Sequence, residues 1–283
     1  MDKKRLVYVL VAVVVIAVAA AAVLLLNSGT SPTLVRYDNV AVPQATMAQL
    51  NSIANNMSLA NSVGTGLAEA SMLPGATGSH MLTLNGLPEV LYIGADYCPY
   101  CAATRWGLVI ALMRFGNFSA LHYMTSSAVN GEYDPSTPTF TFYNSSYASS
   151  YISFVGVETY TNYVPSGASY YAALQTPTQS EGVIFNKYDT NNTLLPADAR
   201  GGIPFVDFGN LSIEDGALVM PDAFYTHTWD QIVSSLSKSN TQQSQAAIGA
   251  ANVYTAAICR MTNNTPSSVC GQPFVKAATA FLG

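Results

Sequence analysis

The chain has 283 residues, of which 49% are hydrophobic and only 10% are charged, and its formal net charge at pH 7 is −5. This length allows one large domain or two small ones with a substantial buried core. With 11 basic against 16 acidic residues, the chain lacks the basic surface of a nucleic-acid-binding protein, so no nucleic-acid partner is expected. Two origins of the low charge stay open: an acidic external milieu, or compositional drift in an exported protein.

The first part of the chain has the pattern of a membrane anchor. Residues 1–5 include three basic side chains, and residues 6–26 form an unbroken apolar run. About 20 apolar residues in a helix are long enough to cross a bilayer. Because the basic residues precede the run, we expect a single-pass protein of the cell membrane, with a cytoplasmic stub and an extracytoplasmic domain. A cleaved signal peptide is the alternative, although this run exceeds the usual apolar length of one.

The region between the anchor and the first long strand is predicted to be a linker followed by helices. Residues 27–43 are polar and form the linker, and residues 44–80 form a helical lead-in, with helical spacing of apolar residues over 44–60. A short strand is expected at 81–84. The continuous apolar run 89–95 is typical of a central strand that is covered on both faces.

The motif Asp96-Tyr97-Cys98-Pro99-Tyr100-Cys101 follows this strand and opens a helix that is expected to reach residue 113. The first cysteine is placed at the helix N-terminus, where free backbone N–H groups and the macrodipole favour a thiolate. The second lies one turn further in, close enough to form a disulfide with the first. Cys98 and Cys101 are therefore the candidate catalytic pair for thiol–disulfide chemistry. A strand expected at 118–124 would complete a strand–helix–strand unit.

Residues 127–200 have a different character and are interpreted as an insertion between two halves of the sheet. They contain β-like runs at 139–143 and 151–155, a tyrosine-rich stretch, and a helix expected over 178–187. The elements expected after the insertion are strands at 201–208 and 218–220 and, in a C-terminal helical extension over 228–283, helices at 228–236 and 241–261.

The cysteine motif, together with Ile203-Pro204, resembles the thioredoxin superfamily. The stretch from Leu91 to Trp106 is more closely similar to an uncharacterised, mainly archaeal family of membrane-anchored proteins, domain of unknown function 929, and the resemblance extends over most of the chain after about residue 45. It implies an α/β thioredoxin-like fold over 81–283, with a central mixed sheet flanked by helices, an insertion before the cis-proline strand, and C-terminal helices.

The same resemblance implies roles for individual residues. Cys98 would be the attacking cysteine, Cys101 the resolving cysteine, and Pro204 a cis-proline that faces them. The Ile203 backbone would pair with an extended substrate segment, and the remaining substrate-binding residues would be Tyr97, Pro99 and Tyr100.

One departure from the superfamily is at Tyr92. Thioredoxin-like proteins often have a buried carboxylate at this position, six residues before the first cysteine, and it assists proton transfer from the second. The nearest carboxylates in this sequence are Glu89 and Asp96. Arg105, one turn after Cys101, is expected to be a solvated helix residue.

The two remaining cysteines, Cys259 and Cys270, are expected to form a structural disulfide, since both pairs can be oxidised outside the cytosol. A disulfide that closes a loop of ~12 residues stabilises a fold by roughly 3 kcal/mol in the chain-entropy model. Soft thiolates also suit copper or zinc, with His80, His122 or His227 as a further ligand. However, the absence of a second CxxC disfavours a closed tetrahedral site, so no metal and no cofactor are expected.

These patterns together predict a membrane-anchored extracytoplasmic thiol–disulfide oxidoreductase, an oxidase or isomerase of exported proteins that carry thiols or disulfides. A membrane quinone-linked redox partner is expected to recharge it. Two alternatives stay open: a copper chaperone on the same fold, and a surface binding module in which all disulfides are structural.

Overall fold

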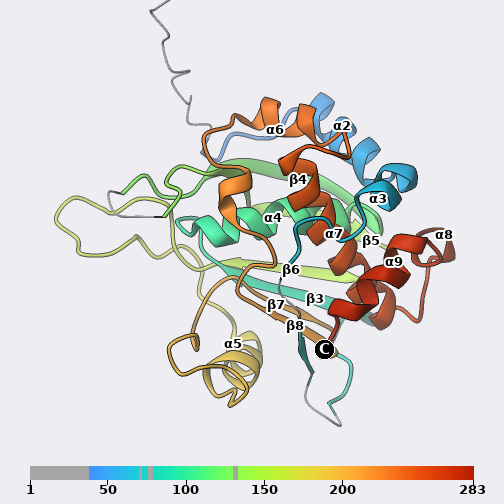
Figure 1. Ribbon diagram of the computed structural model, residues 1–283. Helices are drawn as coiled ribbons and strands as arrows, with labels where there is room; N and C mark the ends of the chain where they lie inside the picture. Colours follow the sequence, from blue (N-terminus) through green and yellow to red (C-terminus); the bar gives the residue numbers. More distant parts are fainter. Residues whose placement is uncertain (1–37, 70–71, 76–78, 130–132) are drawn as a thin grey trace, which may run out of the picture. The chain divides into compact units, whose positions relative to one another are not determined.

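The strand that leads to the cysteine motif lies at the centre of a mixed sheet (Figure 1). β3 (Leu87–Gly94) pairs in parallel with β6 (Ser153–Glu158) and antiparallel with β7 (Phe205–Phe208). The sheet is completed by three further strands, each antiparallel to its neighbour: β8 (Ser212–Asp215) beside β7, β1 (Leu73–Pro74) beside β8, and β2 (Thr83–Leu84) beside the start of β3. The expected α/β architecture with a central mixed sheet is confirmed.

This description rests on a computed structural model that describes residues 38–69, 72–75, 79–129 and 133–283. The predicted anchor at 6–26 lies outside the described residues. Among the helices that are described, none has both the length and the apolar character needed to cross a membrane.

Helices cover both faces of the sheet, as the apolar sequence of β3 predicts. Val90 and Tyr92 belong to the larger apolar core, on the face covered by α4 (Pro99–Leu112) and α7 (Gln242–Met261). Leu91 and Ile93 point to the opposite face, because successive strand residues alternate. There they pack in a smaller cluster with residues of α5 (Gln179–Phe185) and of the π-helical turn η1 (Asn186–Thr190).

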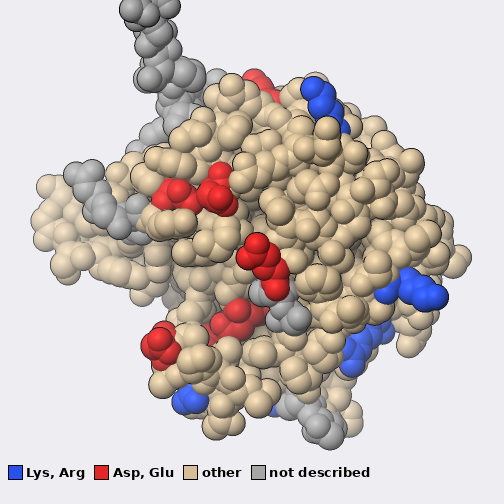
Figure 2. Space-filling model, in the orientation of Figure 1, with Lys and Arg blue, Asp and Glu red and all other residues tan. Residues whose placement is uncertain are grey.

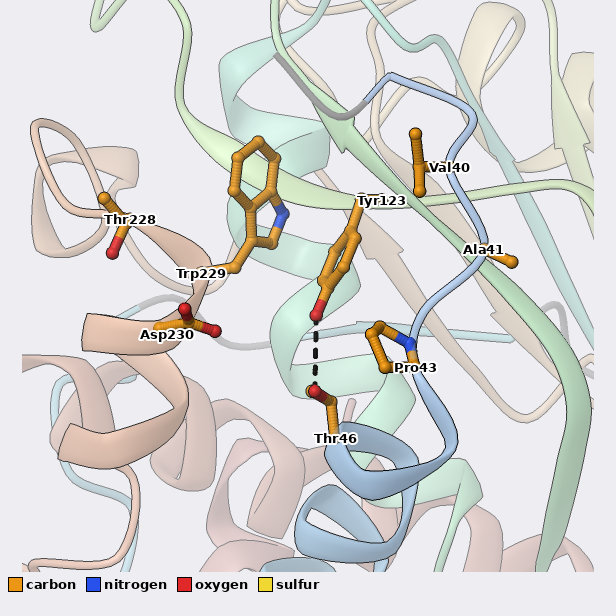
Figure 3. Close-up of a pocket in the computed structure, with 8 residues that line it drawn as sticks. All are labelled: Val40, Ala41, Pro43, Thr46, Tyr123, Thr228, Trp229 and Asp230. Atoms are coloured by element: carbon orange, nitrogen blue, oxygen red, sulfur yellow. Dashed lines mark hydrogen bonds between the residues drawn. The ribbon is translucent and has the colours of Figure 1, made fainter. Parts of the chain in front are cut away.

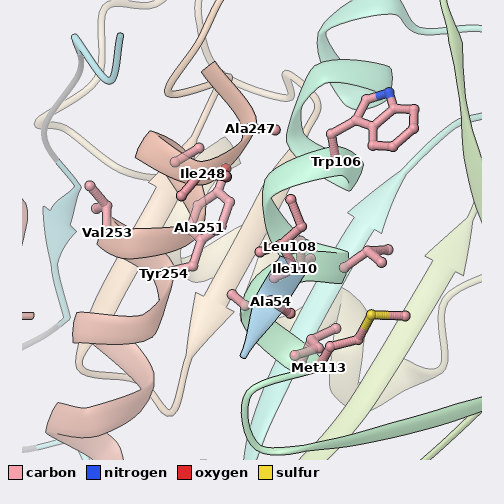
Figure 4. Close-up of a cluster of buried hydrophobic side chains, with 14 of the residues drawn as sticks. Ala54, Trp106, Leu108, Ile110, Met113, Ala247, Ile248, Ala251, Val253 and Tyr254 are labelled. Atoms are coloured by element: carbon pink, nitrogen blue, oxygen red, sulfur yellow. The ribbon is translucent and has the colours of Figure 1, made fainter. Parts of the chain in front are cut away.

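The two longest described helices pack closely against each other (Figure 4). Gly107 of α4 permits this approach, because a Cβ atom at this position would lie 2.8 Å from the Cβ of Ala250 and 2.9 Å from the Tyr254 ring. Leu108, Ile110 and Tyr254 are fully buried in the same core. Every residue of α4 except Tyr100 is buried, so this helix lies entirely inside the protein.

The strand expected at 118–124 is present but has a different partner. β4 (Gly116–Thr125) pairs antiparallel with β5 (Pro138–Ser149) in a separate two-stranded sheet. The parallel neighbour of β3 is β6, which comes from the predicted insertion at 127–200. The prediction that 118–124 is the second strand of the unit is therefore wrong, because local alternation predicts a strand but not its partner.

Two further expectations are corrected. The helix expected over 44–60 divides into α2 (Gln44–Ala54) and α3 (Met57–Val63), because the Asn56 side chain caps the second helix by accepting from the Leu59 N–H at 3.0 Å. Residues 218–220 form no strand; the Leu218 N–H donates to the Glu214 carboxylate instead of to a neighbouring strand. The remaining helical segments are η2 (Pro221–Ala223), α6 (Trp229–Ser235), α8 (Ser267–Cys270), α9 (Pro273–Ala278) and η3 (Thr279–Phe281).

Candidate functional site

The cysteine pair lies where β3 passes into α4. Cys98 is the N-cap residue of α4, and Pro99 takes the first helical position, where its missing N–H would have no partner. The Cys101 backbone N–H donates to the Cys98 Sγ at 3.1 Å. Both thiols are free; Cys98 is 4% exposed and Cys101 is fully enclosed. The outer sulfur therefore belongs to Cys98.

A loop from the other half of the chain faces this sulfur. The Cys98 Sγ lies 3.8 Å from the carbonyl oxygen of Ile203, and the Ile203–Pro204 peptide bond is cis. Antiparallel pairing explains the contact: the start of β7 lies beside the end of β3, with Phe205 opposite Ile93. The structure thus brings the Ile203 backbone to the Cys98 sulfur, and Pro204 follows it directly in the chain.

The two thiols have different electrostatic surroundings. For Cys98, burial disfavours the charged form, but hydrogen bonds from the Cys101 thiol and backbone and the charge of Arg105 outweigh it and lower the pKa of the Cys98 thiol. Burial raises the pKa of the Cys101 thiol well above its ordinary value, and the adjacent Cys98 raises it further. This difference gives Cys98 the nucleophilic sulfur and keeps Cys101 protonated while the pair is reduced.

Arg105 is buried, in contrast to the solvated position expected for it. Its Nε and Nη2 donate to the two carboxylate oxygens of Glu158 at 2.9 and 2.7 Å, and its Nη2 also donates to the Ala95 carbonyl oxygen at 2.6 Å. Asp96 lies 3.7 Å from the same guanidinium. Burial raises the pKa of Asp96 to about 8, and the negative charge of Glu158 adds to this effect.

Tyr92 occupies the position at which the superfamily often has a carboxylate. Its side chain is fully buried and its hydroxyl has no hydrogen-bond partner among the described residues. Gly94 makes room for it, since a Cβ atom there would lie 2.1 Å from the Tyr92 hydroxyl oxygen. Of the two carboxylates nearest in sequence, Asp96 lies in the site, and Glu89 is near the other end of β3.

Sequence reasoning missed Glu158 as a site residue. It ends β6 opposite Gly94, and its side chain is fully buried. A signal was present, because Glu158 is the only charged residue between 138 and 180 and it ends an apolar strand. A buried charge at such a position needs a partner of opposite sign, which Arg105 provides.

Tyrosines flank the cysteine pair on two sides. The Tyr97 ring is stacked on Tyr171 with centroids 4.2 Å apart, and its hydroxyl lies 3.1 Å from that of Tyr170. Tyr100 is stacked on Tyr133 with centroids 6.1 Å apart. Two of the residues expected to bind substrate, Tyr97 and Tyr100, therefore lie among other aromatic rings. Figure 2 shows that the visible face of the molecule bears few charged side chains.

The second cysteine pair lies in the C-terminal helices. Cys259 and Cys270 form a disulfide with their Cα atoms 5.5 Å apart, at the end of α7 and in α8. Among the described residues, no group of three or more His, Cys, Asp or Glu side chains is arranged to hold a metal ion.

One pocket is lined by none of the predicted site residues. It has a volume of about 220 Å³ and lies between the segment at 40–46, β4 and the start of α6 (Figure 3). The Tyr123 hydroxyl donates to Thr46 Oγ1 at 3.5 Å within it. Its lining is Val40, Ala41, Pro43, Thr46, Tyr123, Thr228, Trp229 and Asp230.

Comparison with known proteins gives a family but no characterised relative. No curated protein and no solved structure matches this chain. Residues 76–260, more than half of the chain, match a family that is described only as a domain of unknown function, and this region includes Cys98, Cys101, Arg105, Glu158 and Ile203. The chain belongs to the family Domain of unknown function (DUF929).

Proposed function

We propose that this protein is a membrane-anchored, extracytoplasmic thiol–disulfide oxidoreductase in which Cys98 and Cys101 are the redox pair. The observation that carries the proposal is the position of Cys98. Its sulfur caps a buried helix, accepts from the Cys101 N–H at 3.1 Å and faces the Ile203 carbonyl at 3.8 Å. A structural pair of cysteines would not need the lowered pKa of Cys98 or this contact with a second loop.

A thioredoxin-like fold is part of the proposal, and the topology supports it. β3 has a parallel neighbour, β6, on one side. On the other side lies β7, which is antiparallel to β3, and then β8, which is antiparallel to β7. The cysteine helix follows β3 directly, and Pro204 precedes β7. This arrangement is the one expected when the segment before β7 forms the substrate-facing loop of the cysteine pair.

The chemistry is two successive exchanges. The Cys98 thiolate attacks one sulfur of a partner disulfide, so that a Cys98–partner bond forms and the second partner sulfur leaves as a thiolate. Cys101 loses its proton and attacks the Cys98 sulfur, which forms the Cys98–Cys101 disulfide and releases the other partner thiolate. Two electrons pass from the cysteine pair to the partner. The reverse sequence oxidises a substrate dithiol.

We assign the reverse direction, or disulfide isomerisation, to the physiological reaction, with exported proteins as substrates and a membrane quinone-linked protein as oxidant. The apolar run at 6–26 and the three basic residues before it support this location. The structural disulfide Cys259–Cys270 also favours an oxidising compartment. A reducing role would require a supply of electrons across the membrane.

The test is an exchange assay with the full-length protein in detergent and a peptide disulfide as substrate. We expect Cys98→Ala to abolish exchange, and a Cys259→Ala/Cys270→Ala double variant to retain it. The double variant is the control, because it removes two cysteines and leaves Cys98 and Cys101 unchanged. Full exchange by Cys98→Ala would refute the proposal and would favour a structural role for both pairs.

A further inference from the structure

A charged cluster beneath the cysteine pair has no role in the exchange steps as written above. It consists of Arg105 on α4, Glu158 at the end of β6, and Asp96 in the turn between β3 and α4. All three side chains are at least 98% buried. A buried charged cluster is expensive to maintain, and apolar residues of similar size would stabilise the fold as well or better. Its presence next to two thiols therefore points to a role in their chemistry.

Arg105 contacts the same backbone group as the attacking cysteine. The Ala95 carbonyl oxygen accepts from the Cys98 backbone N–H at 3.2 Å and from the Arg105 Nη2 at 2.6 Å. The Arg105 guanidinium and the Cys98 backbone N–H therefore share one acceptor, the Ala95 carbonyl oxygen. In addition, Arg105 follows Cys101 by four residues in α4, which places the two side chains on the same face of the helix.

The hydrogen-bonding capacity of Arg105 is only partly used. Glu158 takes two of its hydrogen bonds, but Nη1 has no hydrogen-bond partner among the described residues. The other ionisable groups around it are Tyr92 from β3, Asp96 from the turn, and the two thiols of α4, and Asp38 acts on Asp96 from the N-terminal segment. Burial and the Glu158 charge raise the pKa of Asp96 to about 8, so below that pH Asp96 is mostly neutral.

We propose that Arg105 is a positioning residue that stabilises the Cys98 thiolate through space, and that Glu158 limits this effect by holding the opposite charge. The inference rests on the proposed function, because it assigns the source of reactivity of the same site. It also assigns to the site a buried charge that acts on the first cysteine: an arginine from α4, four residues after Cys101. Arg105 touches no substrate atom in this scheme.

The alternative is that the cluster only fastens β6 to α4. The two explanations predict opposite changes in the Cys98 pKa when Glu158 is lost. If the cluster were only structural, loss of either partner would loosen the turn at Ala95 and weaken the Cys101 N–H bond to the Cys98 Sγ. The pKa of Cys98 would then rise in every variant. If the charge acts on the thiol, loss of Arg105 raises this pKa, whereas loss of Glu158 lowers it.

The experiment measures the pH dependence of Cys98 alkylation by iodoacetamide, followed by mass spectrometry of the labelled peptide. It uses the full-length protein in detergent. All variants carry Asp96→Asn, because Asp96 could otherwise ionise and replace the charge lost at Glu158. Asp96→Asn alone is the reference, and we expect its rate of Cys98 alkylation to match that of the wild type below about pH 7, where Asp96 is already protonated.

In this background we expect Glu158→Gln to move the inflection of Cys98 alkylation to lower pH by about one unit, and Arg105→Met to move it to higher pH by a similar amount. Arg105→Lys keeps the charge but loses the planar pair of hydrogen bonds, so its inflection should stay within a few tenths of a unit of the reference. If Arg105→Met fails to fold, the downward movement in Glu158→Gln still decides, because loosening alone predicts the opposite direction.

Two results overturn the inference: movement of the inflection in the same direction for Glu158→Gln and Arg105→Met, or no movement in Glu158→Gln. The proposed function is tested separately, because alkylation requires no exchange partner. Opposite movements together with a lack of exchange would refute the proposed function alone. Normal exchange with an unmoved inflection would refute the role of Arg105 alone.

Discussion

The sulfur of Cys98 lies 3.8 Å from the backbone carbonyl oxygen of Ile203, 105 residues later in the chain. Two adjacent antiparallel strands, β3 and β7, produce this contact, because the end of one lies beside the start of the other. Cys101 is fully enclosed behind it. An incoming sulfur atom that approaches along the Ile203 backbone therefore meets Cys98 first.

This geometry predicts which cysteine carries the covalent intermediate. We expect Cys101→Ser, incubated with a peptide disulfide, to accumulate a stable adduct on Cys98, since the residue that resolves the mixed disulfide is missing. Intact mass and peptide mapping would detect the adduct. The matched variant Cys98→Ser should accumulate little or none, because the remaining thiol is enclosed and its pKa is raised. Equal adducts on both variants would contradict this order of attack.

Local sequence signals predicted the parts of the site that are set by neighbouring residues. The helix start at Cys98 and Pro99 depends on helix-capping preferences, and Thr228, at the start of the helix expected over 228–236, caps α6 by accepting from the Gln231 N–H. The C-terminal helix at 241–261 was similarly visible from its spacing and is observed as α7. In each case the interaction lies within about one helical turn of sequence.

The parts that could not be predicted depend on contacts between distant segments. The pairing of β6 with β3 brings Glu158 to Arg105 across 53 residues, and no local pattern encodes that register. The spacing of α4 predicts one apolar face, but the β4–β5 ribbon and α7 enclose the helix on its other sides. For example, the Trp106 Nε1 donates to the Pro138 carbonyl oxygen at 2.8 Å. Arg105 is therefore buried where the helical pattern predicts solvent.

The tyrosines beside the motif are predicted to affect polypeptide substrates and not small ones. Tyr170 is 50% exposed and is in ring contact with Tyr97. An aromatic contact is worth about 0.5–1.5 kcal/mol, so Tyr170→Ala should slow exchange with an unfolded, aromatic-rich peptide by about two- to tenfold. Exchange with dithiothreitol should be unchanged. Tyr163→Ala is the control, because Tyr163 is 55% exposed in the same loop but makes no ring contact within the described residues. Equal slowing with both substrates would indicate a distorted site.

The disulfide between Cys259 and Cys270 is predicted to contribute to stability and not to exchange. It closes a loop with a sequence separation of 11, which corresponds to about 3 kcal/mol in the chain-entropy model. A Cys259→Ala/Cys270→Ala variant should lose about this much free energy of unfolding in urea titration, with unchanged exchange activity. If the variant lost exchange activity while remaining folded, the second pair would act as a relay to the first.

Stability is predicted to fall as the pH rises from about 5 to about 8. Burial raises the pKa of Glu214 to about 8 and that of Asp207 to about 7, whereas the same side chains in the unfolded chain have a pKa near 4. The folded protein therefore keeps protons that the unfolded chain releases. The resulting stabilisation is complete below about pH 4 and is lost as the pH rises through 7 to 8. Each group contributes up to about 1.4 kcal/mol per pH unit over this range.

Melting temperatures of the full-length protein across this pH range test the prediction, and Glu214→Gln identifies the main group. Glu214 accepts from the Tyr254 hydroxyl at 2.8 Å and from Thr104 at 3.2 Å, and glutamine retains an acceptor oxygen without a charge. We expect Glu214→Gln to melt with a weaker pH dependence, and Asp198→Asn, at an exposed carboxyl, to behave like the wild type. This direction suits a domain in acidic surroundings. A melting temperature that rises towards pH 8 would contradict the protonated state of the buried carboxyls.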